Sequence, residues 1–315
     1  MFDLSVFLLT LQNVAYLLIF IFIGYLLRRS GKLDRNSATV VSILTTFVFS
    51  PCYTASNLPK SFTLANLGQN ALLIGISTAL ILGVILVARL LGFHLGRDGF
   101  ERRTFSYMFA FANTGYFGYP VIQGVFGDEV LGKFMVFCLP VNIAIYSYGY
   151  GLFVGGTGGK FQLIKVLLSP LMLGFYAGAF LGLTGLGLPS LCGKVLATAG
   201  SCMSPASMIL AGLVMGAFPL KRLLSGLRPY LLGLIRLLGL PIFWGLILYL
   251  VGVRGLPLFL SLVSVSLPAG MNIVVYPESL GQDASDNAKL CFVSVLMSLI
   301  TLPFVFTVIQ AVAGL

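Results

Sequence analysis

Charged residues divide this sequence into ten long uncharged segments, and that pattern constrains the fold more than any other feature. A helix needs about 20 apolar residues to cross a bilayer. Only 9% of the residues are charged and the mean hydropathy is +1.02, whereas soluble domains are about a quarter charged. The sequence therefore predicts an all-α membrane protein with ten transmembrane helices, from the uncharged segments 4–27, 36–59, 61–88, 104–127, 134–159, 166–193, 195–220, 237–253, 255–277 and 290–315.

The fourth segment contains Asn113-Thr-Gly-Tyr-Phe-Gly-Tyr-Pro120, which opposes a continuous helix. Gly115 and Gly118 have low helix propensity, and Pro120 lacks an amide hydrogen and clashes with the preceding turn. Irregular backbone at membrane depth is tolerated only where protein or a water-filled cavity satisfies its polar groups. The stretch predicts a broken helix near the bilayer midplane, with the amide of Asn113 beside the break.

The ninth segment has a second candidate break, in Ser266-Leu-Pro-Ala-Gly-Met-Asn272. Pro268 and Gly270 weaken the helix just before Asn272, and Pro277 follows at its inner end. Two half-helices that meet at such breaks direct their N-terminal amides at one site. Those ends carry partial positive charge and favour an anion.

The two halves of the chain resemble each other. Three features recur at offsets of 154 to 159 residues, which indicates two five-helix repeats, 1–154 and 161–315. Because five is odd, the second repeat must be inverted in the membrane, with the broken helices 4 and 9 in corresponding positions. Chance matching in so biased a composition is the alternative. The recurring pairs are Pro51 with Pro205, Asn113 with Asn272, and Pro120 with Pro277.

The distribution of Lys and Arg predicts the orientation. With ten helices both termini lie on one side. If that side is extracytoplasmic, the inner loops hold 15 of the 19 Lys and Arg residues and the outer loops four. The positive-inside rule therefore predicts extracytoplasmic termini in a cell (inner) membrane. The eighth helix is expected to begin near Pro229, with Arg89 and Arg236 extending to the inner surface.

These motifs resemble the auxin efflux carrier family, which includes the plant PIN auxin exporters and bacterial malate and malonate permeases. The matching features are the Asn-Thr seven residues before Pro120, the proline of helix 2, the Pro-Ala-Gly-Met-Asn of helix 9, and the five-plus-five layout. Only residues 155–160 connect the halves, which is similar to the bacterial permeases. Ile273 stands where the plant proteins have the crossing proline of helix 9, so the second break is expected nearer Pro268 or Pro277.

The resemblance implies elevator-type alternating access. Helices 1, 2, 6 and 7 would form a scaffold, and helices 3–5 and 8–10 a transport domain. Helices 2 and 7 would make a homodimer interface. Among site residues the resemblance carries over Asn113, Pro120 and Asn272.

Polar residues at the breaks are the candidate substrate-binding residues. A buried asparagine must be hydrogen-bonded, so Asn113 and Asn272 either satisfy the freed carbonyls or contact substrate. Two further groups either line the pathway or serve helix packing: Ser50 and Thr54 in helix 2, and Ser204 and Ser207 in helix 7. Tyr146, Tyr148 and Tyr150 are expected to form an interfacial aromatic belt.

Several functions lack the residues they need. No Asp or Glu lies well inside a segment, so coupling through a buried carboxylate has no obvious carrier. The single histidine, His94, is expected in an inner loop, and the five cysteines lack metal-ligand spacing. We therefore expect no enzymatic activity, no metal, no cofactor and no nucleic-acid partner, and transport driven by the anion gradient and the membrane potential or by co-transport on a substrate group.

The sequence predicts a secondary transporter of a small organic anion, such as malate, malonate or an auxin-like acid. The alternatives are an ion-coupled symporter of the bile-acid or antiporter type and a membrane sensor that uses a transporter fold without turnover.

Overall fold

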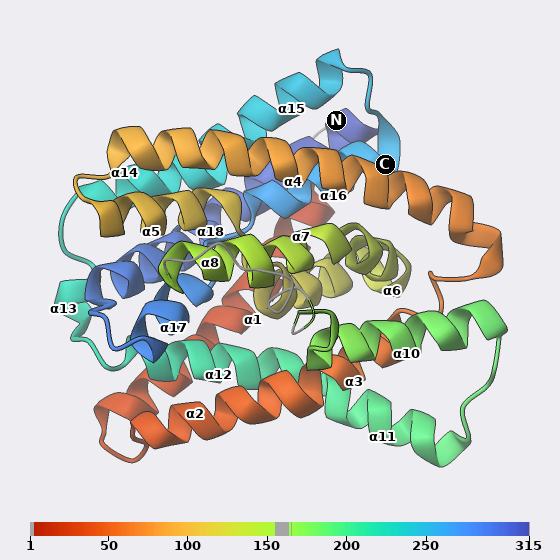
Figure 1. Ribbon diagram of the computed structural model, residues 1–315, viewed down its shortest axis with the longest axis horizontal. Helices are drawn as coiled ribbons and strands as arrows, with labels where there is room; N and C mark the ends of the chain where they lie inside the picture. Colours follow the sequence, from red (N-terminus) through yellow and green to blue (C-terminus); the bar gives the residue numbers. More distant parts are fainter. Residues whose placement is uncertain (1–2, 155–163, 165, 315) are drawn as a thin grey trace.

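The computed structural model describes residues 3–154, 164 and 166–314, and the elements named within them are all helical (Figure 1). The predicted connection 155–160 lies outside these residues. The first half of the chain contains α1 (Leu4–Arg29), α2 (Arg35–Leu44), η1 (Thr45–Phe49), α3 (Ser50–Asn57), η2 (Leu64–Asn66), α4 (Leu67–Leu95), α5 (Gly99–Ala110), η3 (Thr114–Gly118), α6 (Tyr119–Phe137), α7 (Leu139–Ala144), η4 (Ile145–Gly149) and α8 (Tyr150–Val154).

The second half repeats this mixture of long and short helices. It contains α10 (Pro170–Thr184), α11 (Ser190–Ser201), α12 (Met203–Met215), α13 (Leu220–Leu223), α14 (Arg228–Leu234), η5 (Ile235–Gly239), α15 (Leu240–Leu250), α16 (Gly255–Ser266), α17 (Asn272–Ser279) and α18 (Ser285–Ala313).

Six helical stretches of the described chain are long and apolar enough to cross a membrane, and a seventh is reached if the pair 114–137 and 139–154, bent by 46°, counts as one span. Two shorter apolar helices, α10 and α16, lie where helices 6 and 9 are expected. The count of ten remains a prediction. The six long stretches are Leu4–Arg29, Asn36–Asn57, Leu64–Leu95, Ser190–Met215, Arg228–Leu250 and Ser285–Ala313.

Four segments are π-helical: η1, η4 and η5 lie inside longer helices, and η3 forms the first turn of the helix that continues as α6. Three of them end two residues before a proline: Pro51, Pro120 and Pro241. A proline inside a helix has no amide hydrogen, and its ring collides with the carbonyl four residues earlier. Widening the preceding turn to the π form relieves both problems without ending the helix.

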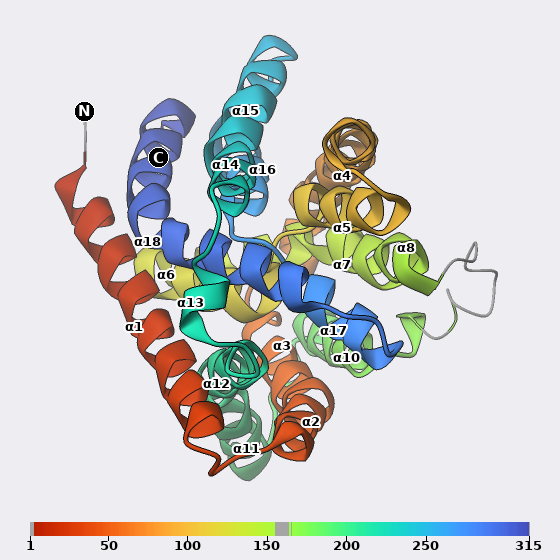
Figure 2. The same ribbon diagram turned by 90° about the vertical axis from the view of Figure 1, so that its left-hand side faces the viewer.

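The helices gather on two sides of the molecule. Both ribbon views place α2, α11 and α12 opposite α4, α14 and α15 (Figures 1 and 2). On the first side α1 packs along α12, and α3 packs against α10 and α11; on the second, α4 packs along α5. Small residues allow close approach within a bilayer: a Cβ on Gly212 of α12 would lie 2.9 Å from the Cα of Gly24 in α1.

Arg236 corrects one sequence expectation. The eighth span begins at Arg228, close to the predicted start. Arg236, however, does not extend to the inner surface, because its side chain is fully buried, at 0% exposure. The π-helical turn η5 holds this arginine inside the helix packing, eight residues into the span.

Candidate functional site

Two broken helices cross in the middle of the molecule. Residues 111–113 follow α5, residues 267–271 follow α16, and the two strands of backbone run antiparallel, with Ala112 paired to Ala269. The backbone N–H of Asn113 donates to the Pro268 carbonyl at 2.9 Å, and the backbone N–H of Gly270 donates to the Phe111 carbonyl at 3.1 Å. The crossing thus satisfies backbone groups that both breaks release, as an apolar environment requires.

The second break has a local cause in the sequence. Proline disfavours helical backbone in the residue before it, and Leu267 before Pro268 is extended, with φ −67° and ψ 155°. The first break has no proline where α5 ends. Phe111 is extended there, with φ −119° and ψ 118°, and its carbonyl bonds to Gly270. Hydrogen bonding to the backbone of helix 9 therefore accounts for the end of α5, which the local sequence does not explain.

The predicted break residues of helix 4 lie after the irregular backbone of residues 111–113. Gly115 and Gly118 belong to η3, and Pro120 lies in the first turn of α6, which continues η3. The expectation that Pro120 makes the break was wrong, because a proline near a helix start is tolerated and the π turn before it absorbs the clash. In helix 9, Pro268 and Gly270 lie at the crossing, whereas Pro277 lies inside α17.

A cavity of about 60 Å³ opens beside the crossing. The helical turns that begin at Thr114 and Asn272 both start on it, and the first amides of a helix have no acceptor within that helix. The cavity therefore receives two partially positive helix ends. Its lining residues are Ser50, Tyr107, Ala112, Asn113, Thr114, Gly115, Tyr116, Tyr119, Asn142, Ile145, Tyr146, Leu171, Met203, Gly270, Met271 and Asn272.

Of the predicted polar residues, the structure brings Asn113, Asn272 and Ser50 together at this cavity. Asn113 is 6% exposed, and its side chain makes no hydrogen bond to another described residue. Asn272 Nδ2 donates to the hydroxyl of Tyr276 at 3.1 Å. The side-chain amide of Asn113 thus has fewer hydrogen-bond partners among the described residues than that of Asn272.

Two of the other three predicted polar residues form hydrogen bonds within their own helices instead. The Thr54 hydroxyl donates to the Ser50 carbonyl at 3.0 Å, and the Ser207 hydroxyl donates to the Ser204 carbonyl at 2.9 Å. The Ser204 hydroxyl is buried and has no hydrogen-bond partner in the described part of the chain. None of these three lines the cavity.

Sequence reasoning missed the aromatic wall of the cavity. Tyr107, Tyr116, Tyr119 and Tyr146 all line it, together with Asn142, whose Nδ2 donates to the Tyr119 hydroxyl at 3.4 Å. The assignment of Tyr146 to an interfacial belt was therefore wrong. Tyr116 and Tyr119 stand inside the motif that predicted the break, and that position was the available signal.

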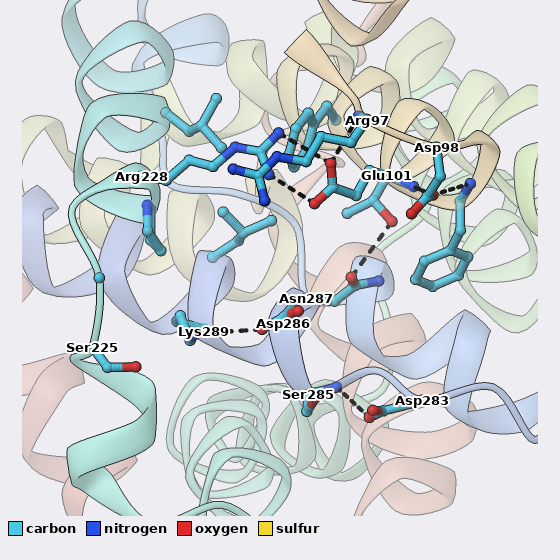
Figure 3. A pocket seen from close by; sticks show the side chains of 17 residues that line it. Arg97, Asp98, Glu101, Ser225, Arg228, Asp283, Ser285, Asp286, Asn287 and Lys289 are labelled. Atoms are coloured by element: carbon cyan, nitrogen blue, oxygen red, sulfur yellow. Dashed lines mark hydrogen bonds and ion pairs between the residues drawn. The ribbon is translucent and has the colours of Figure 1, made fainter.

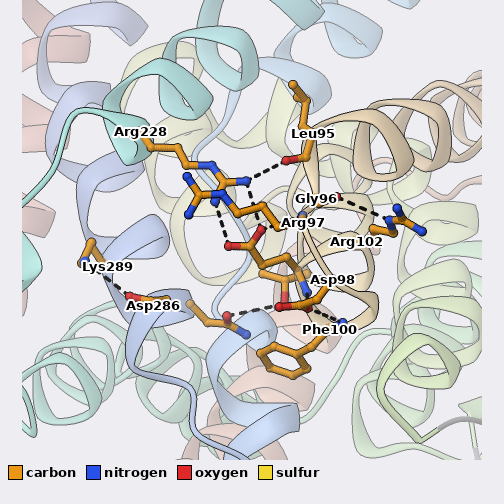
Figure 4. Close-up of polar contacts among 12 residues, drawn as sticks. Leu95, Gly96, Arg97, Asp98, Phe100, Arg102, Arg228, Asp286 and Lys289 are labelled. Atoms are coloured by element: carbon orange, nitrogen blue, oxygen red, sulfur yellow. Dashed lines mark hydrogen bonds and ion pairs between the residues drawn. The ribbon is translucent and has the colours of Figure 1, made fainter.

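A second, larger pocket of about 390 Å³ lies at the start of α5 (Figure 3). Arg228 donates to both carboxylate oxygens of Glu101, at 2.8 and 3.0 Å, and to the carbonyl of Leu95 at 2.6 Å. Its guanidinium also lies 5.0 Å from the ring centre of Phe105. This side chain joins the ends of α4 and α5 to the start of α14 (Figure 4).

Burial of the Glu101 carboxyl acts to raise its pKa, but hydrogen bonds from Arg228 and the Arg97 amide, with the charge of Arg228, outweigh it and lower the pKa below 4.5. The pocket also contains Lys289, 3.3 Å from Asp286, and Asp283, which accepts from the Ser285 amide at 2.9 Å. Most of its charges are thus already paired or capping, which suits a structural junction better than a ligand site.

No three His, Cys, Asp or Glu side chains among the described residues are grouped as a metal site requires. The apolar helices, the two broken helices and the uncharged cavity at their crossing define a class, the membrane transporters built around discontinuous helices.

Sequence comparison identifies the family within that class. The sequence model of the family described as "Membrane transport protein" matches residues 9–158 and 158–306. The chain belongs to this family, the auxin efflux carrier family whose motifs it shares, which is a transporter family and not an enzyme class.

Two relatives agree with this assignment. The chain is similar to an uncharacterized transporter of Methanothermobacter thermautotrophicus, with 26% identity over 303 residues, 93% of this chain and 96% of the relative. It is also similar to an uncharacterized transporter of Methanocaldococcus jannaschii, with 24% identity over 297 residues, 92% of this chain and 95% of the relative.

Proposed function

We propose that this chain is a secondary transporter of a small organic anion, a carboxylate of the malate, malonate or auxin type, and that the anion binds at the helix crossing. The observation that carries the proposal is the meeting of two helix N-termini at one cavity. Each such end is equivalent to about half a positive charge. The described lining residues include no Asp, Glu, Lys or Arg, so the dipole ends dominate the local potential.

The side chains around the cavity suit a carboxylate. Asn113, Asn272 and Asn142 supply amide donors, and Tyr116 and Tyr146 supply hydroxyl donors. Donors aimed at a carboxylate form charge-assisted hydrogen bonds, which are about twice as strong as neutral ones. The Tyr107 and Tyr119 rings add an apolar wall that fits the hydrocarbon part of such an acid.

We propose elevator-type movement with the domains predicted from the resemblance. In the structure's terms the scaffold is α1, α2–α3, α10 and α11–α12, and the transport domain is α4–α8 and α14–α18. The packing of α3 against α10 and α11 supports the first group. The cavity lies between the groups, because Ser50, Leu171 and Met203 come from the scaffold and its other lining residues from the transport domain.

The membrane layout follows the same proposal. If each broken pair, α5 with α6 and α16 with α17, counts as one span, the described helices fit ten spans in two inverted repeats with extracytoplasmic termini. With Arg236 assigned to the interior, the inner loops keep 14 of the Lys and Arg residues against four outside, and the positive-inside rule still favours this orientation in the cell membrane.

A homodimer through helices 2 and 7 is part of the proposal. Large apolar side chains on both helices face outward, with Val40 at 57%, Phe47 at 62%, Leu191 at 72% and Val195 at 57% exposure. Such side chains suit either lipid or a second copy of the chain. Cross-linking of single-cysteine variants at positions 47 and 195 in membranes would test the interface.

Thermal stabilisation of the purified protein by mono- and dicarboxylates would identify the substrate. Binding to the folded state raises the melting temperature. With the best ligand, Asn113→Ala should weaken binding by about tenfold, because it removes one hydrogen bond to a charged group. The matched control is Asn36→Ala, at an exposed position at the start of α2. Equal affinities for the two variants would remove Asn113 from the site.

Counterflow of a radiolabelled acid in proteoliposomes separates a carrier from a sensor, because a sensor binds without exchange. Uptake under an imposed pH gradient at zero membrane potential tests the coupling. We expect little response to that gradient and a strong response to potential, since the potential acts on an anion with about 2.3 kcal/mol per charge per 100 mV. Uptake that follows the pH gradient alone would favour the symporter alternative.

A further inference from the structure

Arg236 is the most unusual polar residue of the described chain. It lies at 0% exposure within the span Arg228–Leu250. Its Nη1 donates to the carbonyl of Phe109 at 2.9 Å, while Nε and Nη2 are buried without a hydrogen-bond partner among the described residues. A charge in the bilayer interior is costly and marks a functional position unless it is compensated.

The compensation comes from the broken helix. Phe109 lies in the last turn of α5, which ends at Ala110. The last carbonyls of a helix lack intrahelical donors and carry partial negative charge. Helix 4 has such an end inside the membrane only because it is broken there. Arg236 therefore supplies a positive charge to the negative end that the break creates.

The depth of Arg236 follows from its spacing to Arg228. Arg228 bonds to Glu101 at the start of α5, and Arg236 bonds to Phe109 eight residues further along α5. Both arginine and partner advance by eight residues, so the two helices run parallel. At 1.5 Å per residue Arg236 lies about 12 Å deeper than Arg228, which is close to the middle of a hydrocarbon layer about 30 Å thick.

No carboxylate on the neighbouring helices faces Arg236 within ion-pair distance in the described residues. The helix α16 and the flanking α15 carry no charged residue. The only carboxylates of α5 and α18 are Glu101 and Asp286, which lie in the first turns of those helices and pair with Arg228 and Lys289. Among the described residues, the printed hydrogen-bond partner of Arg236 is therefore the carbonyl of Phe109 at the end of α5.

In carriers with broken helices, the C-terminal ends of half-helices and the unwound carbonyls coordinate the coupling cation. We propose that Arg236 is a resident cation that takes this position permanently. It neutralises the carbonyl end of α5 at Phe109, three residues before Ala112 of the cavity lining, so that the transport cycle needs no co-transported metal cation. The inference rests on the proposed anion transport and assigns the residue that replaces ion coupling in it.

Three substitutions separate charge from structure. Arg236→Lys keeps the charge, Arg236→Gln keeps a donor without the charge, and Arg236→Ala leaves space for an added cation. We expect Arg236→Lys to retain most of the uptake and Arg236→Gln to lose about tenfold or more. In wild-type proteoliposomes, uptake should be the same with sodium chloride as with choline chloride, and an imposed Na⁺ gradient should not drive accumulation.

A second measurement needs no substrate. The melting temperature of purified Arg236→Ala should rise in millimolar guanidinium chloride relative to choline chloride, because a small cation can bind at the vacated position. The wild type and the matched control Arg228→Ala, whose partner Glu101 is partly exposed at the inner pocket, should show no such rise.

Uptake by the wild type that is driven by a Na⁺ gradient would overturn the inference while leaving anion transport intact. Equal uptake by Arg236→Lys and Arg236→Gln, or a guanidinium effect that is the same in Arg236→Ala and Arg228→Ala, would also overturn it. If the wild type transports none of the acids, the proposed function fails, and the guanidinium measurement still decides whether position 236 is a cation site.

Discussion

The two ends of α5 are held by two arginines of the same span in different ways. At the start of α5, Arg228 meets the Glu101 carboxylate in a pocket where both side chains are about 30% exposed. At the other end of the same helix, Arg236 is fully buried, and its one hydrogen-bond partner among the described residues is the Phe109 carbonyl. One helix is thus anchored by an ion pair where water reaches it and by a helix dipole where water does not.

The difference follows from the cost of burying charge. A carboxylate at the depth of Arg236 would have to lose its own hydration as well, and a buried ion pair often recovers little of that cost. A backbone carbonyl at a broken helix end is already present and already lacks a donor. The broken helix therefore explains why an arginine without a carboxylate partner is tolerated at this position.

Reversing the charge at the buried end should give the largest effect. Arg236→Glu places a negative charge against the negative end of α5 with no hydration to offset it. We expect a loss of several kcal/mol, enough to eliminate the folded protein. Fluorescence-detected size-exclusion chromatography of detergent extracts measures this outcome. A monodisperse Arg236→Glu protein would contradict the dipole argument.

Removing the ion pair at the start of α5 should cost less. Glu101→Gln with Arg228→Gln in a double-mutant cycle should give a coupling of about 1–2 kcal/mol, because the pair is bidentate but partly exposed. Apparent melting temperatures of the single and double variants supply the cycle. A coupling near zero would show that the two ends of α5 do not differ as described.

The same pair should make stability fall in acid. The folded pKa of Glu101 lies below its ordinary value of 4.5, so its contribution is present above pH 4.5 and is lost as the pH falls through the folded pKa. The melting temperature of the wild type should drop in that window, and that of Glu101→Gln should drop less. Identical acid profiles would exclude Glu101 as the cause.

A solvent-exposed ion pair should give the smallest change in stability. Lys60 and Asp128 are 3.2 Å apart, with 68% and 47% exposure. Such pairs contribute little because water and salt screen them. Lys60→Ala should change stability by less than about 0.5 kcal/mol. A larger change in melting temperature would mean that solvent exposure does not determine the order of the stability effects at Arg236, at the Glu101–Arg228 pair and at the Lys60–Asp128 pair.

The sequence was most informative where a residue type has one physical consequence. Apolar length predicted the six long apolar helices that the structure describes, while the count of ten stays a prediction. Pro268 predicted the end of α16, since proline acts on the residue before it. Asn113 and Asn272 could be placed near each other from the two motifs, and the structure has both at one cavity.

Tertiary pairing explains what could not be predicted. The end of α5 depends on backbone from residues 268–270, far along the chain, and nothing local to Phe111 indicates it. Pro120 widens a turn rather than breaking the helix. Tyr146 and Arg236 face inward because of helix rotation, which composition does not encode.

A structure with a bound acid would show directly whether the anion binds at the helix crossing. The protein would be imaged by electron cryomicroscopy with the carboxylate that stabilises it most in the thermal screen. We expect ligand density between Asn113 and Asn272, with the carboxylate against the first turns of η3 and α17. Density in the pocket beside Arg228, with an empty crossing, would contradict the assignment of the anion site to the crossing.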